Sequence, residues 1–124
     1  MPEDLTPEVI QRLQMEKIIW FASVRPENRP HMVPLWFVWQ DDRFYISIGP
    51  NSTKARNISA NPNVVVSLED GANPLICECT ARPLSSPAPA AVADLFFQKY
   101  EWNLSTEEHF TQLVELTPVK WVNW

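Results

Sequence analysis

The stretch Pro30-His-Met-Val-Pro-Leu-Trp-Phe-Val-Trp39 decides the fold of this 124-residue chain. Side chains of a strand alternate between its two faces, and here both faces are apolar. One face carries Met32, Pro34, Trp36 and Val38, and the other carries His31, Val33, Leu35, Phe37 and Trp39. A strand of a monomeric barrel normally has one face in water, so the second face predicts a cover: a helix, a second subunit or a flat apolar ligand. Pro34 cannot donate a backbone hydrogen bond, which places it at an edge, a bulge or an opening of the sheet. An opening would leave backbone groups free to bond a ligand.

The segments around this stretch predict a small antiparallel barrel. Besides 30–39, strands are expected at residues 17–24, 43–48, 63–69, 75–81 and 110–124, the last bent at Pro118. Helices are expected from Thr6–Pro7, over 52–60 and over 90–100, with one more turn at the capping-box sequence Ser105-Thr-Glu-Glu108. The predicted fold class is therefore mainly β, with six to seven strands and a few short peripheral helices.

Composition and charge limit the class of protein. The chain is long enough for one core, so a single domain over residues 1–124 is expected. Its formal net charge of −5 argues against general binding to nucleic acids or to an anionic membrane. The acidic N-terminal sequence lacks the hydrophobic run of a signal peptide, and no apolar stretch reaches membrane-spanning length. A cytoplasmic protein is expected.

The two cysteines, Cys77 and Cys79, lie two residues apart on a predicted strand. Both side chains then project from one face, in a geometry too strained for an ordinary disulfide. His31 and His109 belong to other elements, so no metal site is expected. Reduced, partly buried thiols are predicted, which fits the cytoplasm.

The sequence Gly49-Pro-Asn-Ser-Thr-Lys-Ala-Arg-Asn57 follows a strand and opens a helix. It lies within residues 43–68, which hold three basic residues and no acid until Glu69. A capping Ser52, free backbone N–H groups and the cations Lys54 and Arg56 suit an anion, most plausibly a phosphate. The alternative is a solvated helix whose two cations only keep the surface soluble. The local sequence does not separate these interpretations.

Five stretches together resemble the pyridoxamine 5′-phosphate oxidase-like split β-barrel superfamily. The resemblance rests on Val24-Arg-Pro-Glu-Asn-Arg-Pro-His-Met-Val-Pro-Leu-Trp-Phe37, Phe44-Tyr-Ile-Ser47 and Ser52-Thr-Lys-Ala-Arg-Asn-Ile-Ser-Ala-Asn-Pro62. The later Lys99-Tyr-Glu-Trp102 and Thr117-Pro-Val-Lys-Trp-Val-Asn-Trp124 are similar to its small flavin- and deazaflavin-dependent branch. The order and spacing of the stretches carry the resemblance, which covers nearly the whole chain after the first helix.

The resemblance implies a split barrel that forms a homodimer, with two cofactor sites at the subunit interface. The cofactor phosphate would be held after the third strand, and its ring would lie against backbone of residues 32–36. Trp102 and the terminal Trp121–Trp124 would reach the site of the partner subunit. The expected cofactor-binding set is His31, Met32, Val33, Pro34, Leu35, Trp36, Ser47, Ser52, Thr53, Lys54, Arg56, Asn57 and Trp102. The phosphopyridoxal oxidases proper have a basic residue at the position of Thr53 and a C-terminal extension that is absent here, so oxidation of vitamin B6 is not expected.

Three functions remain open at this point. The favoured one is an oxidoreductase that binds FMN and transfers hydride to or from a small organic substrate; a deazaflavin (coenzyme F420)-dependent reductase is the alternative. A non-enzymatic flavin carrier or sensor is the third function. A barrel that binds single-stranded nucleic acid is disfavoured by the acidic net charge of the chain. No catalytic residue is assigned. His31 and Tyr45 are each either a proton donor or a hydrogen-bonded structural residue.

Overall fold

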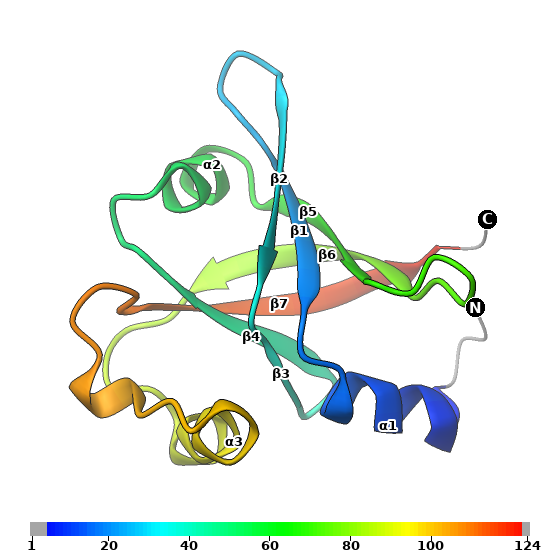
Figure 1. The fold of residues 1–124 in the computed structure, drawn as a ribbon. Coiled ribbons are helices and arrows are strands. Elements are labelled where there is room, and N and C mark those ends of the chain that lie inside the picture. The colour runs from blue at the N-terminus through cyan, green and yellow to red at the C-terminus, as the bar shows by residue number, and fades with distance from the viewer. Residues whose placement is uncertain (1–4, 123–124) are drawn as a thin grey trace.

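The computed structural model describes residues 5–122 and consists of one curled antiparallel sheet of seven strands with three α-helices around it (Figure 1). The strands, in chain order, are β1 Ile19–Val24, β2 Pro30–Leu35, β3 Val38–Gln40, β4 Arg43–Ile48, β5 Asn63–Leu68, β6 Ile76–Pro83 and β7 Gln112–Trp121. The helices are α1 Pro7–Met15, α2 Thr53–Ala60 and α3 Ala90–Tyr100, with a short 3₁₀ helix η1 at Leu104–Thr106. The strand order is β2-β1-β5-β6-β7-β4-β3. The predicted fold class, mainly β with six to seven antiparallel strands and a few short helices, is confirmed.

The prediction of one continuous strand over residues 30–39 was wrong. The strand breaks after Leu35, and Val38 begins a new strand, β3, which pairs with β4 and not with β1. At the break, the backbone N–H and C=O of Phe37 bond the hydroxyl of Tyr100, and the same carbonyl also accepts from Lys99 Nζ. Side chains of α3 therefore satisfy the backbone where the chain leaves one edge of the sheet for the other.

The interior of the curled sheet forms the main core. Its members include Phe21, Phe37, Phe44 and Ile46, which are at most 2% exposed. A second, smaller cluster lies on the outer face of the sheet, where Phe96 of α3 packs with neighbouring side chains of β3, β4 and β7. The sheet is thus covered by α3 on one part of its outer surface, as an apolar outer face requires.

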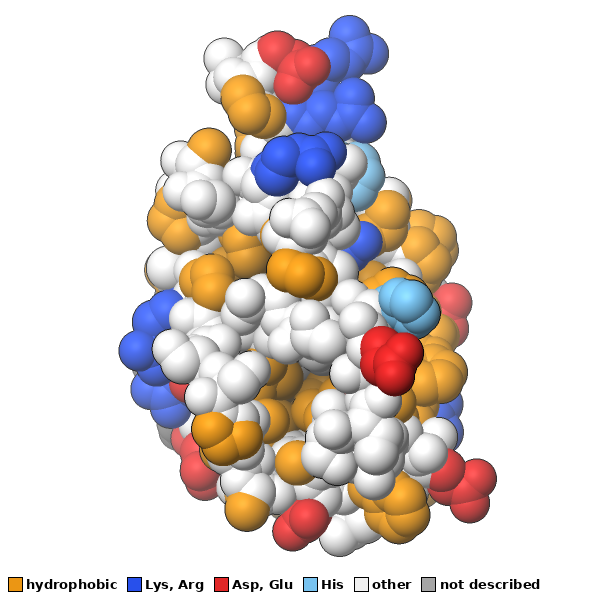
Figure 2. Space-filling view, turned by 90° about the vertical axis from the view of Figure 1, so that its left-hand side faces the viewer, with side chains coloured by type: hydrophobic (Ala, Val, Ile, Leu, Met, Phe, Trp, Pro, Cys, Tyr) orange, Lys and Arg blue, Asp and Glu red, His pale blue; other side chains and the backbone are white. Residues whose placement is uncertain are grey.

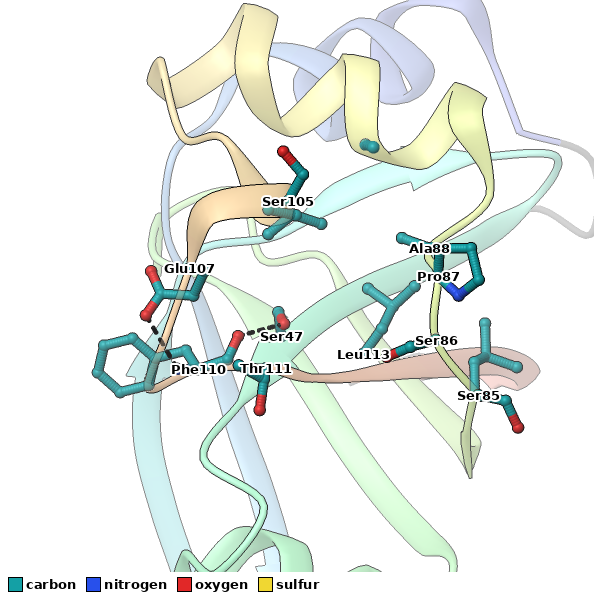
Figure 3. A pocket seen from close by; sticks show the side chains of 13 residues that line it. Ser47, Ser85, Ser86, Pro87, Ala88, Ser105, Glu107, Phe110, Thr111 and Leu113 are labelled. Atoms are coloured by element: carbon teal, nitrogen blue, oxygen red, sulfur yellow. Dashed lines mark hydrogen bonds between the residues drawn. The ribbon is translucent and has the colours of Figure 1, made fainter.

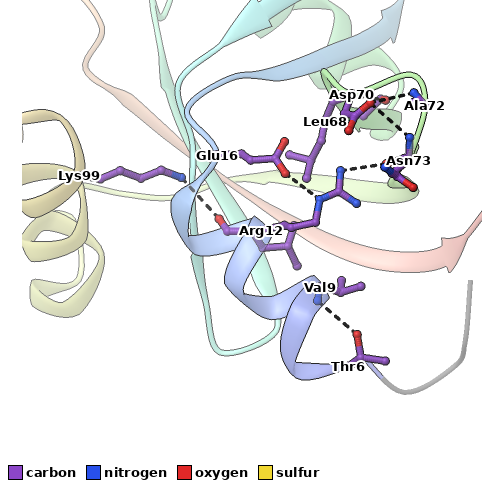
Figure 4. A network of polar contacts seen from close by, with 11 residues as sticks. Thr6, Val9, Arg12, Glu16, Leu68, Asp70, Ala72, Asn73 and Lys99 are labelled. Carbon is purple, nitrogen blue, oxygen red and sulfur yellow. Dashed lines mark hydrogen bonds and ion pairs between the residues drawn. The ribbon is translucent and has the colours of Figure 1, made fainter.

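The first helix is fixed at both of its ends. Its cap is Thr6, as predicted, whose hydroxyl accepts from the N–H of Val9 (Figure 4). Near its end, Arg12 pairs with Glu16 at 2.7 Å and donates to the carbonyl of Asn73 in the β5–β6 loop. The bond from Arg12 to Asn73 ties the end of α1 to the β5–β6 loop.

Both cysteines are free and buried in the main core, Cys77 at 0% and Cys79 at 2% exposure. The prediction that the two thiols form no disulfide is confirmed, but they are fully buried and not partly buried as predicted. The hydrogen bond with Cys77, together with burial, raises the pKa of the Cys79 thiol. The predicted bend in the last strand is present as well, since the pairing of β6 with β7 skips Val119, next to Pro118.

Candidate functional site

The sheet is split between β2 and the second half of β4. Strand β3 pairs with β4 only at residues 43–45, whereas β2, which precedes β3 in the chain, pairs with β1. Continued backwards, the β3–β4 register would place Trp36 opposite Ser47, but there the two strands have separated. Within residues 5–122, β2 pairs only with β1, and residues 46–48 of β4 pair only with β7. The edges of β2 and of residues 46–48 that face the split therefore have no partner strand. Unpaired strand edges present backbone N–H and C=O groups. The prediction that Pro34 lies at an edge, a bulge or an opening is confirmed, since Pro34 lies in the edge strand β2, next to the split.

A pocket of about 480 Å³ occupies one end of this split. Five residues of the predicted cofactor-binding set line it together: Pro34, Leu35, Trp36, Ser47 and Trp102. Three further residues, Ile18, Glu107 and Phe110, line it and were not predicted. We call this region, with Tyr100 behind it, the α3 end of the split.

Aromatic rings are packed against one another at the α3 end. The ring of Trp36 stacks on that of Tyr100 with centroids 4.5 Å apart and planes 5° apart, and it meets Trp102 edge-on at 5.7 Å. Trp36 nevertheless remains 47% exposed. It therefore offers part of its surface to a ligand while its orientation is fixed by neighbours.

Glu107 organises the loop that closes this pocket. Its carboxylate accepts hydrogen bonds from the indole N–H of Trp102 at 2.7 Å and from the backbone N–H groups of His109 and Phe110. Bonds from the Phe110 and His109 backbone and from Trp102 lower the pKa of Glu107 to about 2. The capping box predicted at 105–108 was wrong, since the cap of η1 is Asn103. The sequence signal that was missed for this contact is the position of Glu107 five residues after Trp102, within a loop and not within a helix.

The other end of the split, which we call the α2 end, is the segment Gly49–Arg56. Ser52 is the N-cap of α2, as predicted: its hydroxyl accepts from the N–H of Ala55 and donates to the carbonyl of Gly49. Arg56 folds back over the helix start, donating to the carbonyl of Asn51 at 2.7 Å and to the Thr53 hydroxyl at 3.3 Å. Lys54, by contrast, has no hydrogen bond or ion pair with the residues described.

Basic side chains gather at the upper end of the face shown in Figure 2, while hydrophobic side chains floor a hollow in its lower half. The hairpin between β1 and β2, which carries Arg25 and Arg29, projects at the top of the molecule near α2 (Figure 1). The face therefore changes from cationic to apolar along its length, although the whole chain is acidic.

Asn57 lies on the buried face of α2 and is only 1% exposed; its side-chain amide donates to the hydroxyl of Ser23 on β1 at 3.0 Å. This bond holds the helix on the barrel. The contact of Asn57 with a cofactor remains a prediction.

The remaining predicted residues, His31, Met32 and Val33, lie on the part of β2 that leads to the hairpin. Met32 is 62% exposed. His31 Nδ1 is buried and finds no hydrogen-bond partner in the part of the chain described, so a hydrogen-bonded structural role is unsupported at this atom. Tyr45 differs: its hydroxyl donates to Glu115, and burial together with that carboxylate raises its pKa.

The terminal tryptophans are only partly described. Trp121 packs near Trp39 and Phe44, with ring centroids 6.1 Å apart in both pairs. Trp124 lies outside the described residues. Across residues 5–122, no group of three or more His, Cys, Asp or Glu side chains is arranged to hold a metal ion.

Residues 5–124 match the sequence profile of the family described as pyridoxamine 5′-phosphate oxidase. The chain belongs to this family. The match covers the split, the α2 segment and the loop that carries Glu107. No protein with a curated description matches the sequence.

Solved structures share the same fold. The heme storage protein HutZ of Vibrio cholerae superposes with a TM-score of 0.78 at 22% identity, over 94% of this chain and 91% of that one. An F420 reductase gives 0.75 at 22% identity over 98% of both chains. General Stress Protein 26 of Bacillus anthracis gives 0.65 at 22% identity over 87% of this chain and 84% of that one. At these identities the likeness extends to the fold only.

Among the residues described, no helix has both the length and the apolar character needed to cross a bilayer.

Proposed function

We propose that this protein is a flavin-dependent oxidoreductase that binds FMN in the split between β2 and β4. The observation that carries the proposal is the polarity of the split: a helix start with an unengaged Lys54 at one end, and partly exposed aromatic rings at the other. FMN has a matching polarity, with a phosphate at one end and a flat ring system at the other.

The residues present fit this cofactor. Backbone N–H groups at a helix start and a lysine are suited to a phosphate, and the Ser52 cap keeps that helix start in place. The open edge of β2 offers backbone donors and acceptors to the polar rim of the ring, and the aromatic surface of Trp36 suits its apolar part.

When bound, FMN supplies the hydride chemistry, and the protein supplies orientation, charge and exclusion of water. Lys54 would balance the phosphate charge, and Arg56 would hold the loop 49–53 in shape through its bonds to Asn51 and Thr53. The Glu107–Trp102 bond would keep the wall of the ring pocket rigid. His31 Nδ1 is the one buried imidazole nitrogen without a partner in the part of the chain described, which makes it the candidate to hold or move a proton.

We propose that the protein acts as a homodimer whose second subunit covers the outer surface of β2. Exposed Met32 and Trp36, at 62% and 47%, form an apolar edge beside the split, and exposed apolar patches mark interaction sites. Analytical ultracentrifugation should give twice the mass of one chain. A monomer mass for the wild type would count against a dimer. A dimer mass that Met32→Glu leaves unchanged would count against this interface.

Two other occupants have specific support. The fold is shared with an F420 reductase, and the same split would accept a deazaflavin phosphate; however, the long acidic tail of that coenzyme is disfavoured by the net charge of −5. The fold is also shared with a heme storage protein, and a carrier role without turnover would follow from heme or flavin binding alone. The substrate in the oxidoreductase case is a small organic molecule.

Two reduced thiols in the core support a cytoplasmic location.

Absorbance spectra separate these cases. The purified protein is measured alone and after addition of FMN, coenzyme F420 or heme, each followed by gel filtration. Retention of a flavin spectrum, and its bleaching and recovery with a reductant and an acceptor, is the expected result. Retention of a deazaflavin or heme spectrum instead would refute FMN as the cofactor, and flavin retention without turnover would leave the carrier.

A further inference from the structure

A second cavity lies beside the pocket of the split, beneath α3 (Figure 3). Its volume is about 400 Å³, and its walls come from the β6–α3 connection, α3, η1, the loop between η1 and β7, and the adjoining parts of β4 and β7. The function proposed above makes no use of this cavity.

The walls of this cavity combine hydroxyl groups with an apolar surface. Ser85, Ser86 and Thr111 are exposed at the rim of the cavity, and their hydroxyls make no hydrogen bond with residues 5–122. These hydroxyls can therefore exchange water for a ligand. Leu84 and Leu113 supply an apolar surface between them. Such a lining suits a compact organic molecule that carries hydrogen-bonding oxygen or nitrogen atoms.

The charge of the cavity restricts the ligand further. Glu107 is the only charged residue among its described lining residues, and its carboxylate is already bonded to three donors. The backbone and indole donors lower the pKa of Glu107 to about 2, so its carboxylate is negatively charged at neutral pH. An anion would therefore meet a negative charge with no cation to balance it, and a cation would find the carboxylate largely occupied.

The cavity and the pocket of the split share a wall made of Ser47, Glu107 and Phe110. The backbone carbonyl of Phe110 accepts from Ser47 Oγ at 2.6 Å, and the backbone N–H of Phe110 donates to Glu107 at 3.0 Å. Both backbone polar groups of Phe110 are therefore fixed by hydrogen bonds. Its ring is 54% exposed. One layer of side chains thus separates the two spaces, and the Phe110 ring is the part of it least confined by packing.

We propose that this cavity is the substrate pocket, that it binds small uncharged molecules with hydrogen-bonding groups, and that the Phe110 ring turns out of the shared wall so that the bound substrate can contact the cofactor ring for hydride transfer. The ligand class follows from the cavity itself, whereas its role as substrate pocket rests on the proposed function.

The ligand class is tested with three probes of nearly equal shape: benzamide, benzoate and benzamidine. Each is titrated into cofactor-free protein while the backbone amide NMR signals of Ser85, Ser86 and Thr111 are followed. Benzamide should shift these signals, and benzoate should bind at least about tenfold more weakly. Equal or tighter binding of benzoate, tighter binding of benzamidine, or benzamide shifts confined to other residues would overturn the assignment.

A pair of matched variants locates the binding. Ala93 on α3 lines the cavity, whereas Ala91 on the same helix is exposed and does not. Ala93→Leu should fill the cavity and weaken benzamide binding at least about tenfold, while Ala91→Leu should leave it within twofold. Equal effects of the two variants would contradict the location.

The relation to the flavin is measured on the same samples. FMN should bind both variants alike, and benzamide should then change the fluorescence of bound FMN in the Ala91→Leu protein and not in the Ala93→Leu protein. Failure of FMN to bind any sample would refute the proposed function but leave the ligand class standing on the NMR data. Bound FMN that does not respond to benzamide would refute the substrate role alone.

Discussion

The two ends of the split are built in opposite ways. The α2 end comes from one continuous segment of eight residues, and its polar contacts are local: Ser52 to Gly49 and Ala55, and Arg56 to Asn51 and Thr53. The α3 end joins residues far apart in the chain, since Trp36 stacks on Tyr100 and Ser47 bonds Phe110. The α2 end therefore depends on a loop and a helix cap, and the α3 end depends on the tertiary fold.

This difference assigns different work to the two ends. A local cationic loop suits recognition of a phosphate, whose charge needs few contacts in defined directions. A rigid aromatic wall suits a flat ring, which needs surface and orientation. Comparing FMN with riboflavin, which lacks the phosphate, isolates the α2 end from the α3 end.

The largest effect is expected at the α2 end. Replacing Lys54 and Arg56 together by Ala should weaken FMN binding by about 2–4 kcal/mol, because the charge-assisted contact of Lys54 with the phosphate is lost and the loop that Arg56 holds in shape is loosened. Riboflavin binding should not change. Quenching of flavin fluorescence measures both affinities, and Lys120→Ala, at an exposed lysine on β7, serves as the control. An unchanged FMN affinity in the double variant would remove the phosphate assignment.

The attachment of α2 to the barrel should appear as stability. Asn57→Ala leaves the buried hydroxyl of Ser23 without its donor, so the free energy of unfolding should fall by about 1–3 kcal/mol. Urea unfolding of the cofactor-free protein measures this, with the exposed Asn63→Ala as the matched control. If the two variants are equally stable, the Asn57–Ser23 bond does not hold the α2 end in place.

A smaller effect on binding is expected at the α3 end. Trp36→Ala removes the exposed ring surface, and should weaken FMN and riboflavin equally, each by about 1 kcal/mol. Phe97→Ala, at an exposed aromatic residue of α3 that lines neither the split nor the cavity beside it, should change neither affinity. A loss for FMN that exceeds the loss for riboflavin would mean that Trp36 contacts the phosphate half, contrary to the proposed orientation.

The smallest effect concerns the anchor of the α3 end, Lys99. Burial, with a contribution from nearby Lys17, lowers the pKa of Lys99 to about 7 from its usual 10.5. Between those pH values the unfolded chain binds more protons than the folded one, so stability should rise with pH above about 7. The rise should be less than about 1 kcal/mol per pH unit. Urea unfolding at pH 7, 8 and 9 should show a steeper rise for the wild type than for Lys99→Met, and parallel curves would disprove the shift.

The same contrast explains what the sequence could predict. Strand alternation and helix caps are local, so the barrel, the Ser52 cap and the limits of α3 at residues 90–100 were predicted correctly. The break at Trp36–Phe37 was not, because it depends on Tyr100 and Lys99, more than sixty residues away. The role of Glu107, which lies inside the expected helical turn at 105–108, was missed for the same reason: its partner is an indole placed by the tertiary fold. The α2 end was within reach of sequence reasoning, and the loop wall of the α3 end was not.

The most direct test is a crystal structure of the protein grown with FMN. The phosphate should lie within about 3 Å of Lys54 Nζ and of backbone N–H groups at the start of α2, at ordinary hydrogen-bond distance. The ring should lie along residues 32–36, beside the ring of Trp36. FMN bound away from the split, or with its phosphate at the α3 end, would refute the proposed cofactor site.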